Sequence, residues 1–177
     1  MPNHVHLIVV PQRPDSLARA LGRAHNLYSR WFNRLRRHCG HLWQNRFYSA
    51  PLGRDHLLTA LRYVDLNPVR AGLIERAVDY RWSSAAAHVS GRDSSGLLDL
   101  AAWAEICPRN DWAPYLEAAT QQEALLARIR EATRSGKPLG DARFVHELGR
   151  KAGFALELRP PGRPPKRLAL SSANAHN

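Results

Sequence analysis

The chain opens on an alternating pattern of apolar and polar positions. In residues 4–10, His4 and His6 are separated by a single valine and are followed by Leu, Ile and Val. A short run of this kind, rich in β-branched residues, predicts a β-strand. Because successive side chains of a strand point to opposite faces, His4 and His6 would share one face.

Apolar periodicity predicts two helices in the first half of the chain. Over residues 16–38, apolar side chains recur every three or four positions and arginines fill the rest, which indicates a long amphipathic helix with a basic outer face, capped by Gly40. Residues 41–50 are rich in aromatic side chains and predict a second strand. A second helix is predicted over residues 55–66, where Pro68 disfavours its continuation.

The second half of the chain predicts a mostly helical region and a tail. Helices are expected within residues 97–134 and over 142–151, the latter capped by Asp141. The prolines of residues 159–167 predict an extended basic segment. Its Gly-Arg-Pro core is similar to that of a minor-groove AT-hook, and a solvated basic tail is the alternative. A Gly/Ser-rich stretch around residue 90 divides the chain into predicted regions 1–90, 91–158 and 159–177.

Two pairs of polar residues stand out as candidates for chemistry. His4 and His6, roughly 7 Å apart at Cα on a strand, could converge on one metal ion; exposed histidines on an edge strand are the alternative. Tyr63 and Asn67 are four residues apart, so they share a helix face, roughly 100° from the apolar stripe. A tyrosine hydroxyl can act as a nucleophile and an amide oxygen as a metal ligand. His25, His88, His146 and His176 are expected at the surface.

The charge of the chain indicates which kind of partner it binds. The net charge is +11, and arginine supplies nearly all of the 26 cations. Arginine forms bidentate pairs with phosphate and stacks on bases, so its excess favours a nucleic-acid partner; an arginine-rich codon usage is the alternative explanation. Two cysteines exclude a disulfide framework, and no segment predicts a signal peptide or a membrane span, so the cytosol is the expected location.

Several segments together resemble one protein family. MPNHVHLIV at the start of the chain, LWQNRF at residues 42–47 and RYVDLNPVRAGL at 62–73 are similar, in order and spacing, to segments of REP-associated and IS200-like single-tyrosine transposases of the HUH type. YRWSS at residues 80–84 also fits. The resemblance covers about residues 1–90, and residues 138–145 resemble longer family members more loosely.

The resemblance implies a metal-dependent DNA strand transferase on an α+β fold. The fold would be a ferredoxin-like antiparallel sheet with packed helices, followed by the helical C-terminal region. Tyr63 would form a 5′-phosphotyrosine, while His4, His6 and Asn67 would hold Mg²⁺ or Mn²⁺. The partner would be single-stranded or hairpin DNA, bound by a homodimer or a monomer in the cytoplasm and at the nucleoid. The residues expected to contact DNA are Gln44, Arg46, Arg70, Arg163, Lys166 and Arg167.

Three further expectations qualify this interpretation. Family members carry a strand and a helix before the histidine-bearing strand, so the chain is expected to be truncated or to have a misassigned start. A truncated relative that holds DNA hairpins without cutting them is the alternative function. A structural metal site built on His38, Cys39 and His41 together with the histidine pair of the first strand is a third hypothesis.

Overall fold

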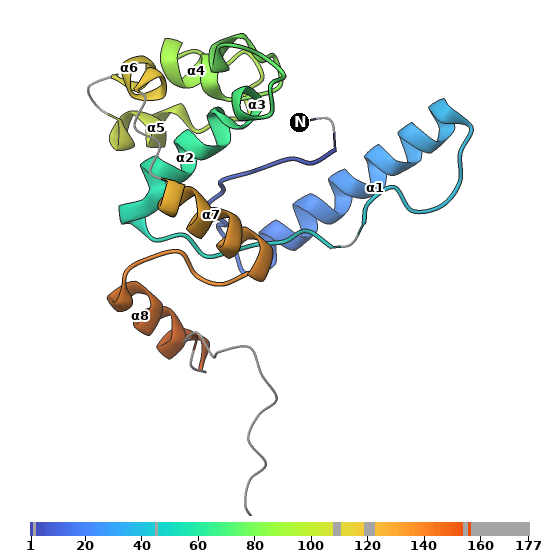
Figure 1. The fold of residues 1–177 in the computed structure, drawn as a ribbon. Helices are drawn as coiled ribbons and strands as arrows, with labels where there is room; N and C mark the ends of the chain where they lie inside the picture. Colours follow the sequence, from blue (N-terminus) through green and yellow to red (C-terminus); the bar gives the residue numbers. More distant parts are fainter. Residues whose placement is uncertain (2, 45, 108–110, 119–122, 154–155, 157–177) are drawn as a thin grey trace, which may run out of the picture.

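The structure is a computed structural model that describes residues 1, 3–44, 46–107, 111–118, 123–153 and 156. Within these residues the regular structure is helical (Figure 1). The elements are α1 (Ser16–Arg36), η1 (Arg54–His56), α2 (Leu57–Asp65), α3 (Asn67–Arg70), η2 (Ala77–Asp79), α4 (Ala85–Ser90), α5 (Leu100–Ile106), α6 (Trp112–Glu117), α7 (Glu123–Ser135) and α8 (Ala142–Ala152). None of the described helices is both long enough and apolar enough to cross a bilayer.

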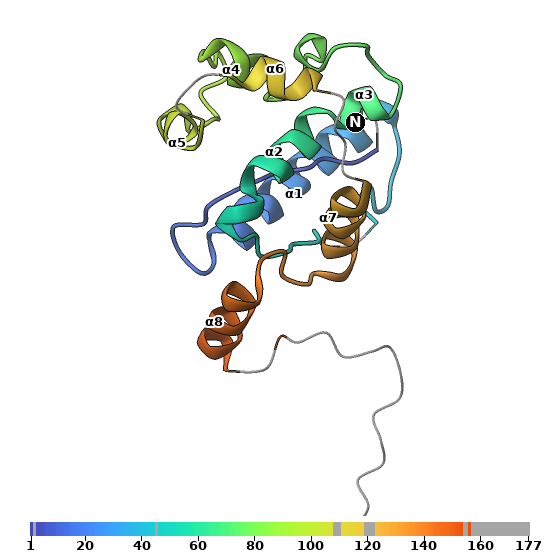
Figure 2. The ribbon, with the colours of Figure 1, turned by 60° about the vertical axis from the view of Figure 1, so that its left-hand side comes forward.

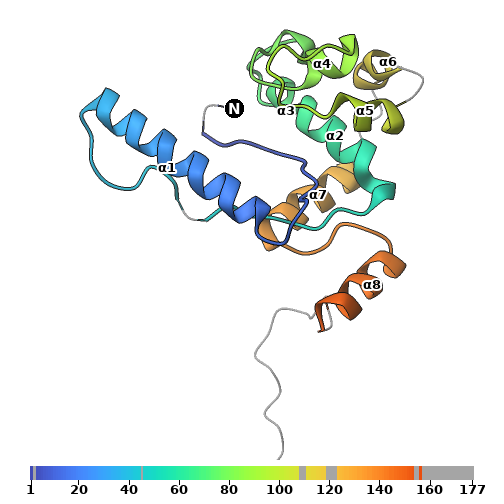
Figure 3. The same ribbon diagram turned by 180° about the vertical axis from the view of Figure 1, so that it is seen from behind.

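The predicted ferredoxin-like antiparallel sheet is wrong. Residues 4–10 are extended and run between α1 and α2 (Figures 1 and 3), but they form no ladder with any other described segment. The described part of residues 41–50 consists of bends and coil rather than a second strand. Alternating apolar side chains favour an extended backbone, whereas a sheet also requires a neighbouring backbone to pair with. That neighbour is not specified by the pattern.

The first predicted helix is confirmed, although none of its residues is buried. α1 begins at Ser16 and ends at Arg36, where Arg37 adopts the left-handed conformation (φ 50°) in place of the predicted cap at Gly40. No residue of α1 is buried, and the Trp31 side chain is 56% exposed. The amphipathic pattern is therefore present in a helix that no sheet covers among the described residues.

The predicted helix at 55–66 is found as η1 followed by α2. Pro68 does not end the helical path, because it lies in the first turn of α3. In that position its missing N–H costs no hydrogen bond. The predicted last helix is also confirmed: α8 begins after Asp141, whose side chain accepts a 2.7 Å hydrogen bond from the Phe144 amide.

One hydrophobic cluster joins α2 to helices α4, α5 and α6, which gather on one side of the molecule (Figure 2). It contains residues from both sides of the predicted boundary near residue 90. Its buried members are Leu66, Ala77, Ala85, Trp103, Cys107, Trp112 and Leu116. The two segments therefore share a core in the structure.

A buried carboxyl lies beside this cluster. Asp65 has no exposed surface and accepts hydrogen bonds from the Ser84 hydroxyl (2.7 Å) and the Trp112 indole (2.9 Å). The Nδ1 atom of His88 lies 2.8 Å from its second oxygen, so the prediction that His88 lies at the surface is wrong. Because a buried polar group needs hydrogen-bond partners, these contacts hold the end of α2 against α4 and α6.

A second cluster packs α7 across α2. Its buried members are Tyr63, Leu126, Ile129, Ala132 and Leu139. Leu139 exchanges backbone hydrogen bonds with the segment before η1: its amide donates to Pro51 (2.8 Å) and its carbonyl accepts from Gly53 (2.7 Å). A Cβ at Gly53 would lie 3.1 Å from the Gly140 Cα, so glycine permits this close approach. The contact fixes the chain that follows α7 beside the start of α2.

Candidate active site

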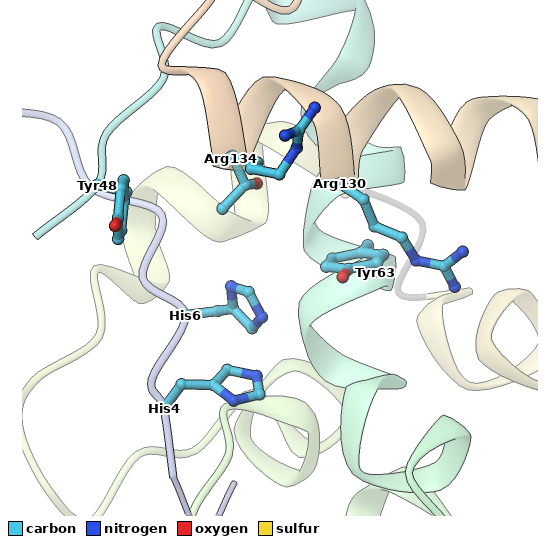
Figure 4. Close-up of a pocket in the computed structure, with 7 residues that line it drawn as sticks. His4, His6, Tyr48, Tyr63, Arg130 and Arg134 are labelled. Atoms are coloured by element: carbon cyan, nitrogen blue, oxygen red, sulfur yellow. The ribbon is translucent and has the colours of Figure 1, made fainter. Parts of the chain in front are cut away.

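The structure brings the predicted histidines and tyrosine together. The rings of His4 and His6 meet edge to face, with 4.9 Å between their centroids. The His6 ring meets the Tyr63 ring in the same way at 5.6 Å. Figure 4 shows Tyr63 on α2 facing the two imidazoles of the extended N-terminal segment across a cavity. Two elements far apart in sequence thus place a phenol beside two imidazoles.

This cavity has a volume of about 410 Å³. Its lining is basic and aromatic and includes neither Asp nor Glu. The lining residues are His4, His6, Tyr48, Tyr63, Arg130, Thr133 and Arg134. A site with these side chains is suited to an anion of the size of a phosphate group.

Tyr63 is less accessible than its helical position predicts. Its residue surface is only 9% exposed, because the ring packs under the apolar side of α7. Arg70 lies over the ring, with its guanidinium carbon 4.3 Å from the centroid, and it also donates to the Tyr63 carbonyl. We expected Arg70 to contact DNA. In the structure it packs on the ring of Tyr63, the candidate nucleophile, and helps to hold that side chain in place. Burial lowers the pKa of the Arg70 guanidinium.

His6 has an environment that favours its neutral form. Burial is the main cause of a lowered His6 pKa, and the charges of His4 and Arg70 lower it further. A positive imidazole is disfavoured both by loss of solvent and by nearby positive charge. His6 therefore presents a nitrogen lone pair at neutral pH, as a metal ligand or a proton acceptor must.

We expect the imidazole of His6 to titrate below pH 6.5, the ordinary histidine value. In the unfolded chain the same group would bind its proton at a higher pH. Its contribution to stability is therefore complete above pH 6.5 and is lost as the pH falls toward the lowered folded-state pKa. NMR titration of the ring protons, without metal, measures the value directly. His4→Ala should raise the pKa of His6, and an unchanged titration curve would contradict the assigned electrostatics.

The predicted third ligand does not join the histidines. Asn67 is absent from the cavity lining; its Oδ1 accepts from Arg70 at 3.4 Å, and its Nδ2 is buried without a partner. The His4 ring is fixed through Nδ1, which lies 2.7 Å from the Asn3 Oδ1 atom. Two imidazoles fit a divalent cation as part of a ligand set, with the other positions left to oxygen ligands such as phosphate and water. Nitrogen donors suit Mn²⁺ better than Mg²⁺.

Other predicted ligands are separate from this cavity. No group of three or more His, Cys, Asp or Glu side chains in the described part of the chain is arranged to hold a metal, so the hypothesis built on His38, Cys39 and His41 gains no support. Gln44 and Arg46 are exposed and do not line the cavity. The predicted DNA contacts at Arg163, Lys166 and Arg167 lie outside the described residues.

The sequence did not indicate four of the residues that line the cavity. Tyr48 lines it from the segment before η1, and Arg130 and Arg134 line it from α7 (Figure 4). Thr133 of α7 also belongs to the lining. The four-residue spacing of Arg130 and Arg134 does predict that they share a helix face. Nothing in that spacing indicates which other helix the face meets.

Part of this site lies in a segment that resembles a known protein family. Residues 1–67 match the family model described as "Transposase IS200 like". Over these residues the chain is similar to transposases of the IS200-like family. The match includes both histidines, Tyr63 and Asn67 and stops short of Arg70, so α7 lies outside it. No curated protein and no solved structure was found to match the chain.

Proposed function

We propose that this IS200-like transposase cleaves and rejoins single-stranded DNA through Tyr63. The observation that carries the proposal is the meeting of the Tyr63 and His6 rings at 5.6 Å, in a basic cavity to which the matched segment contributes both histidines and Tyr63. A phenol beside two imidazoles supplies a nucleophile and a partial cation site. The basic lining supplies attraction for the DNA backbone.

The proposed chemistry is a reversible transfer of a phosphodiester. The Tyr63 oxygen attacks phosphorus, the bond from phosphorus to the 3′ oxygen breaks, and the strand leaves with a 3′-hydroxyl. The phenol proton passes to water in the cavity and the departing oxygen takes up a proton. Since the 5′-phosphotyrosine keeps the energy of the original bond, a free 3′-hydroxyl can attack it and restore the strand. A divalent cation, held by His4 and His6 when bound, would neutralise and orient the phosphate.

The burial of Tyr63 favours a second candidate function. A side chain that is 9% exposed beneath α7 offers little surface to a DNA strand. Cleavage therefore depends on the small part of Tyr63 that lines the cavity, whereas binding of a DNA hairpin does not. A hairpin-binding protein without cleavage activity would form a stable complex and no covalent adduct.

The metal dependence of adduct formation tests the proposed reaction. We expect wild-type protein to form a covalent complex with labelled single-stranded hairpin DNA in Mn²⁺ or Mg²⁺, and to lose it in chelator. His4→Ala and His6→Ala should each lower the rate by about 100-fold or more, because a bound metal stabilises transition-state charge by several kcal/mol. Denaturing gels with radiolabelled DNA measure the adduct.

An exposed histidine on α8 provides the matched control. His146→Ala should form the adduct at the wild-type rate, since His146 lies away from the cavity. Equal rates for all three variants would exclude the histidine pair from the reaction. Tight hairpin binding by wild type without any adduct would favour the second candidate function.

A further inference from the structure

α7 carries two arginines to the Tyr63 cavity from outside the family-matched segment. Arg130 and Arg134 are one helical turn apart and both line the cavity. Figure 4 shows Arg130 alongside the Tyr63 ring and Arg134 further along the same helix. Helical residues four apart have Cβ atoms about 5–6 Å from each other, so the two side chains can act on adjacent groups of one ligand.

The packing of α7 fixes where these arginines lie. Leu126, Ile129 and Ala132 are buried against Tyr63 and Leu139. The Leu139 backbone is in turn bonded to Pro51 and Gly53. The helix is therefore held from its apolar side and from the chain that follows it, which places Arg130 and Arg134 in the cavity wall.

The acidic partners of these arginines are weakly held. Arg130 bonds Glu123 at 2.9 Å and Arg134 bonds Glu131 at 2.6 Å, and in both pairs the two side chains are half exposed or more. Neither glutamate lines the cavity. Exposed ion pairs of this type contribute only about 0–1 kcal/mol, so a phosphate can replace the carboxylate at small cost. Glu123, and after it Tyr63, raises the pKa of Arg130, which stays charged throughout.

We propose that α7 is the phosphate-binding element of this site, with Arg130 on the phosphodiester that Tyr63 attacks and Arg134 on the next phosphate of the same strand. The planar guanidinium of arginine forms two parallel hydrogen bonds to one phosphate, which fixes its orientation as well as its charge. The assignment rests on the proposed function for the identity of the strand. It makes α7 the element that both covers Tyr63 and presents the phosphate to it.

The salt dependence of DNA binding tests this assignment without requiring cleavage. The measurement uses Tyr63→Phe protein and a fluorescent oligothymidylate, so that no adduct interferes. Each phosphate contact to single-stranded DNA contributes about 0.7 to the slope of log K against log salt. Arg130→Ala and Arg134→Ala should each lower the slope by about this amount. Arg128→Ala, an exposed arginine of the same helix outside the cavity, is the matched control and should keep the full slope.

A lysine variant separates charge from geometry, and glutamine variants guard against loss of helix. Arg130→Lys should keep the slope but slow adduct formation about 10-fold or more in the Tyr63 protein, because lysine cannot form the bidentate pair. Arg130→Gln and Arg134→Gln keep much of the side-chain stem and replace the alanine variants if circular dichroism shows that those lose helix.

The possible results distinguish failure of the phosphate site on α7 from failure of the proposed cleavage reaction. Slopes of the α7 variants equal to that of Arg128→Ala overturn the phosphate site, whether or not wild type forms an adduct. Reduced slopes together with no wild-type adduct would uphold the phosphate site and exclude the proposed cleavage reaction. Reduced slopes together with an adduct that the lysine variant slows support both.

Discussion

Tyr63→Phe should reduce the covalent protein–DNA adduct to below about a thousandth of the wild-type level, since the variant lacks the attacking oxygen. Phenylalanine keeps the ring that packs under α7 and beneath Arg70. The fold and the DNA affinity should therefore be little changed, and the variant should be defective only in forming the covalent bond. Radiolabelled DNA on denaturing gels measures the adduct, and fluorescence anisotropy measures binding.

Tyr48 is the control that this comparison requires. It lines the same cavity and is 62% exposed, so it is better placed than Tyr63 for solvent access. Among the described residues, no histidine ring is found against Tyr48 in the way that the His6 ring lies against Tyr63. Tyr48→Phe should form the adduct at a rate near wild type. If Tyr48→Phe removes the adduct and Tyr63→Phe keeps it, the assigned nucleophile is wrong.

Asp65→Ala should lower the free energy of unfolding by about 3–5 kcal/mol, a magnitude typical of removing one partner from a buried charged network. The variant removes the acceptor of three groups: the part-buried Ser84 hydroxyl and the buried His88 imidazole and Trp112 indole. Asp65 also lies two residues after Tyr63 in α2, so its loss loosens the helix that presents the nucleophile. Urea unfolding followed by circular dichroism measures the change.

An exposed aspartate provides the comparison for this prediction. Asp79 pairs with Arg76 across 3.9 Å, and the Asp79 side chain is 51% exposed. Because isolated surface ion pairs contribute little, Asp79→Ala should change the free energy of unfolding by no more than about 0.5 kcal/mol. Equal decreases in the free energy of unfolding for Asp65→Ala and Asp79→Ala would show that the buried hydrogen bonds of Asp65 stabilise the fold no more than a surface ion pair does.

The helices were largely predictable because their signals are local. The apolar periodicity of residues 16–38 reproduces α1, and an aspartate cap before residues 142–151 reproduces α8. The predicted strands were wrong because a strand in a sheet needs a signal that is not local. The alternation around His4 and His6 specifies the faces of an extended segment, whereas sheet formation depends on a backbone partner elsewhere.

The candidate site shows the same division. His4, His6 and Tyr63 were predicted from spacing and family resemblance, and the structure places them together. Arg130 was not, because only the packing of α7 on α2 brings it to the cavity. Asn67 shares the helical sector of Tyr63 in an ideal helix, but the break at Leu66 starts α3 and removes it from the cavity.

Mass spectrometry of the trapped complex identifies the residue that carries the DNA strand, which we predict to be Tyr63. Trypsin cuts after Arg46, Arg54, Arg62 and Arg70, so Tyr63 and Tyr48 fall on different peptides, Tyr63–Arg70 and Phe47–Arg54. After nuclease digestion of the DNA, we predict a nucleotide linked through its 5′-phosphate to Tyr63 in the first peptide. A nucleotide on the second peptide, or no modified tyrosine in a protein that binds the same DNA, would show that Tyr63 is not the nucleophile.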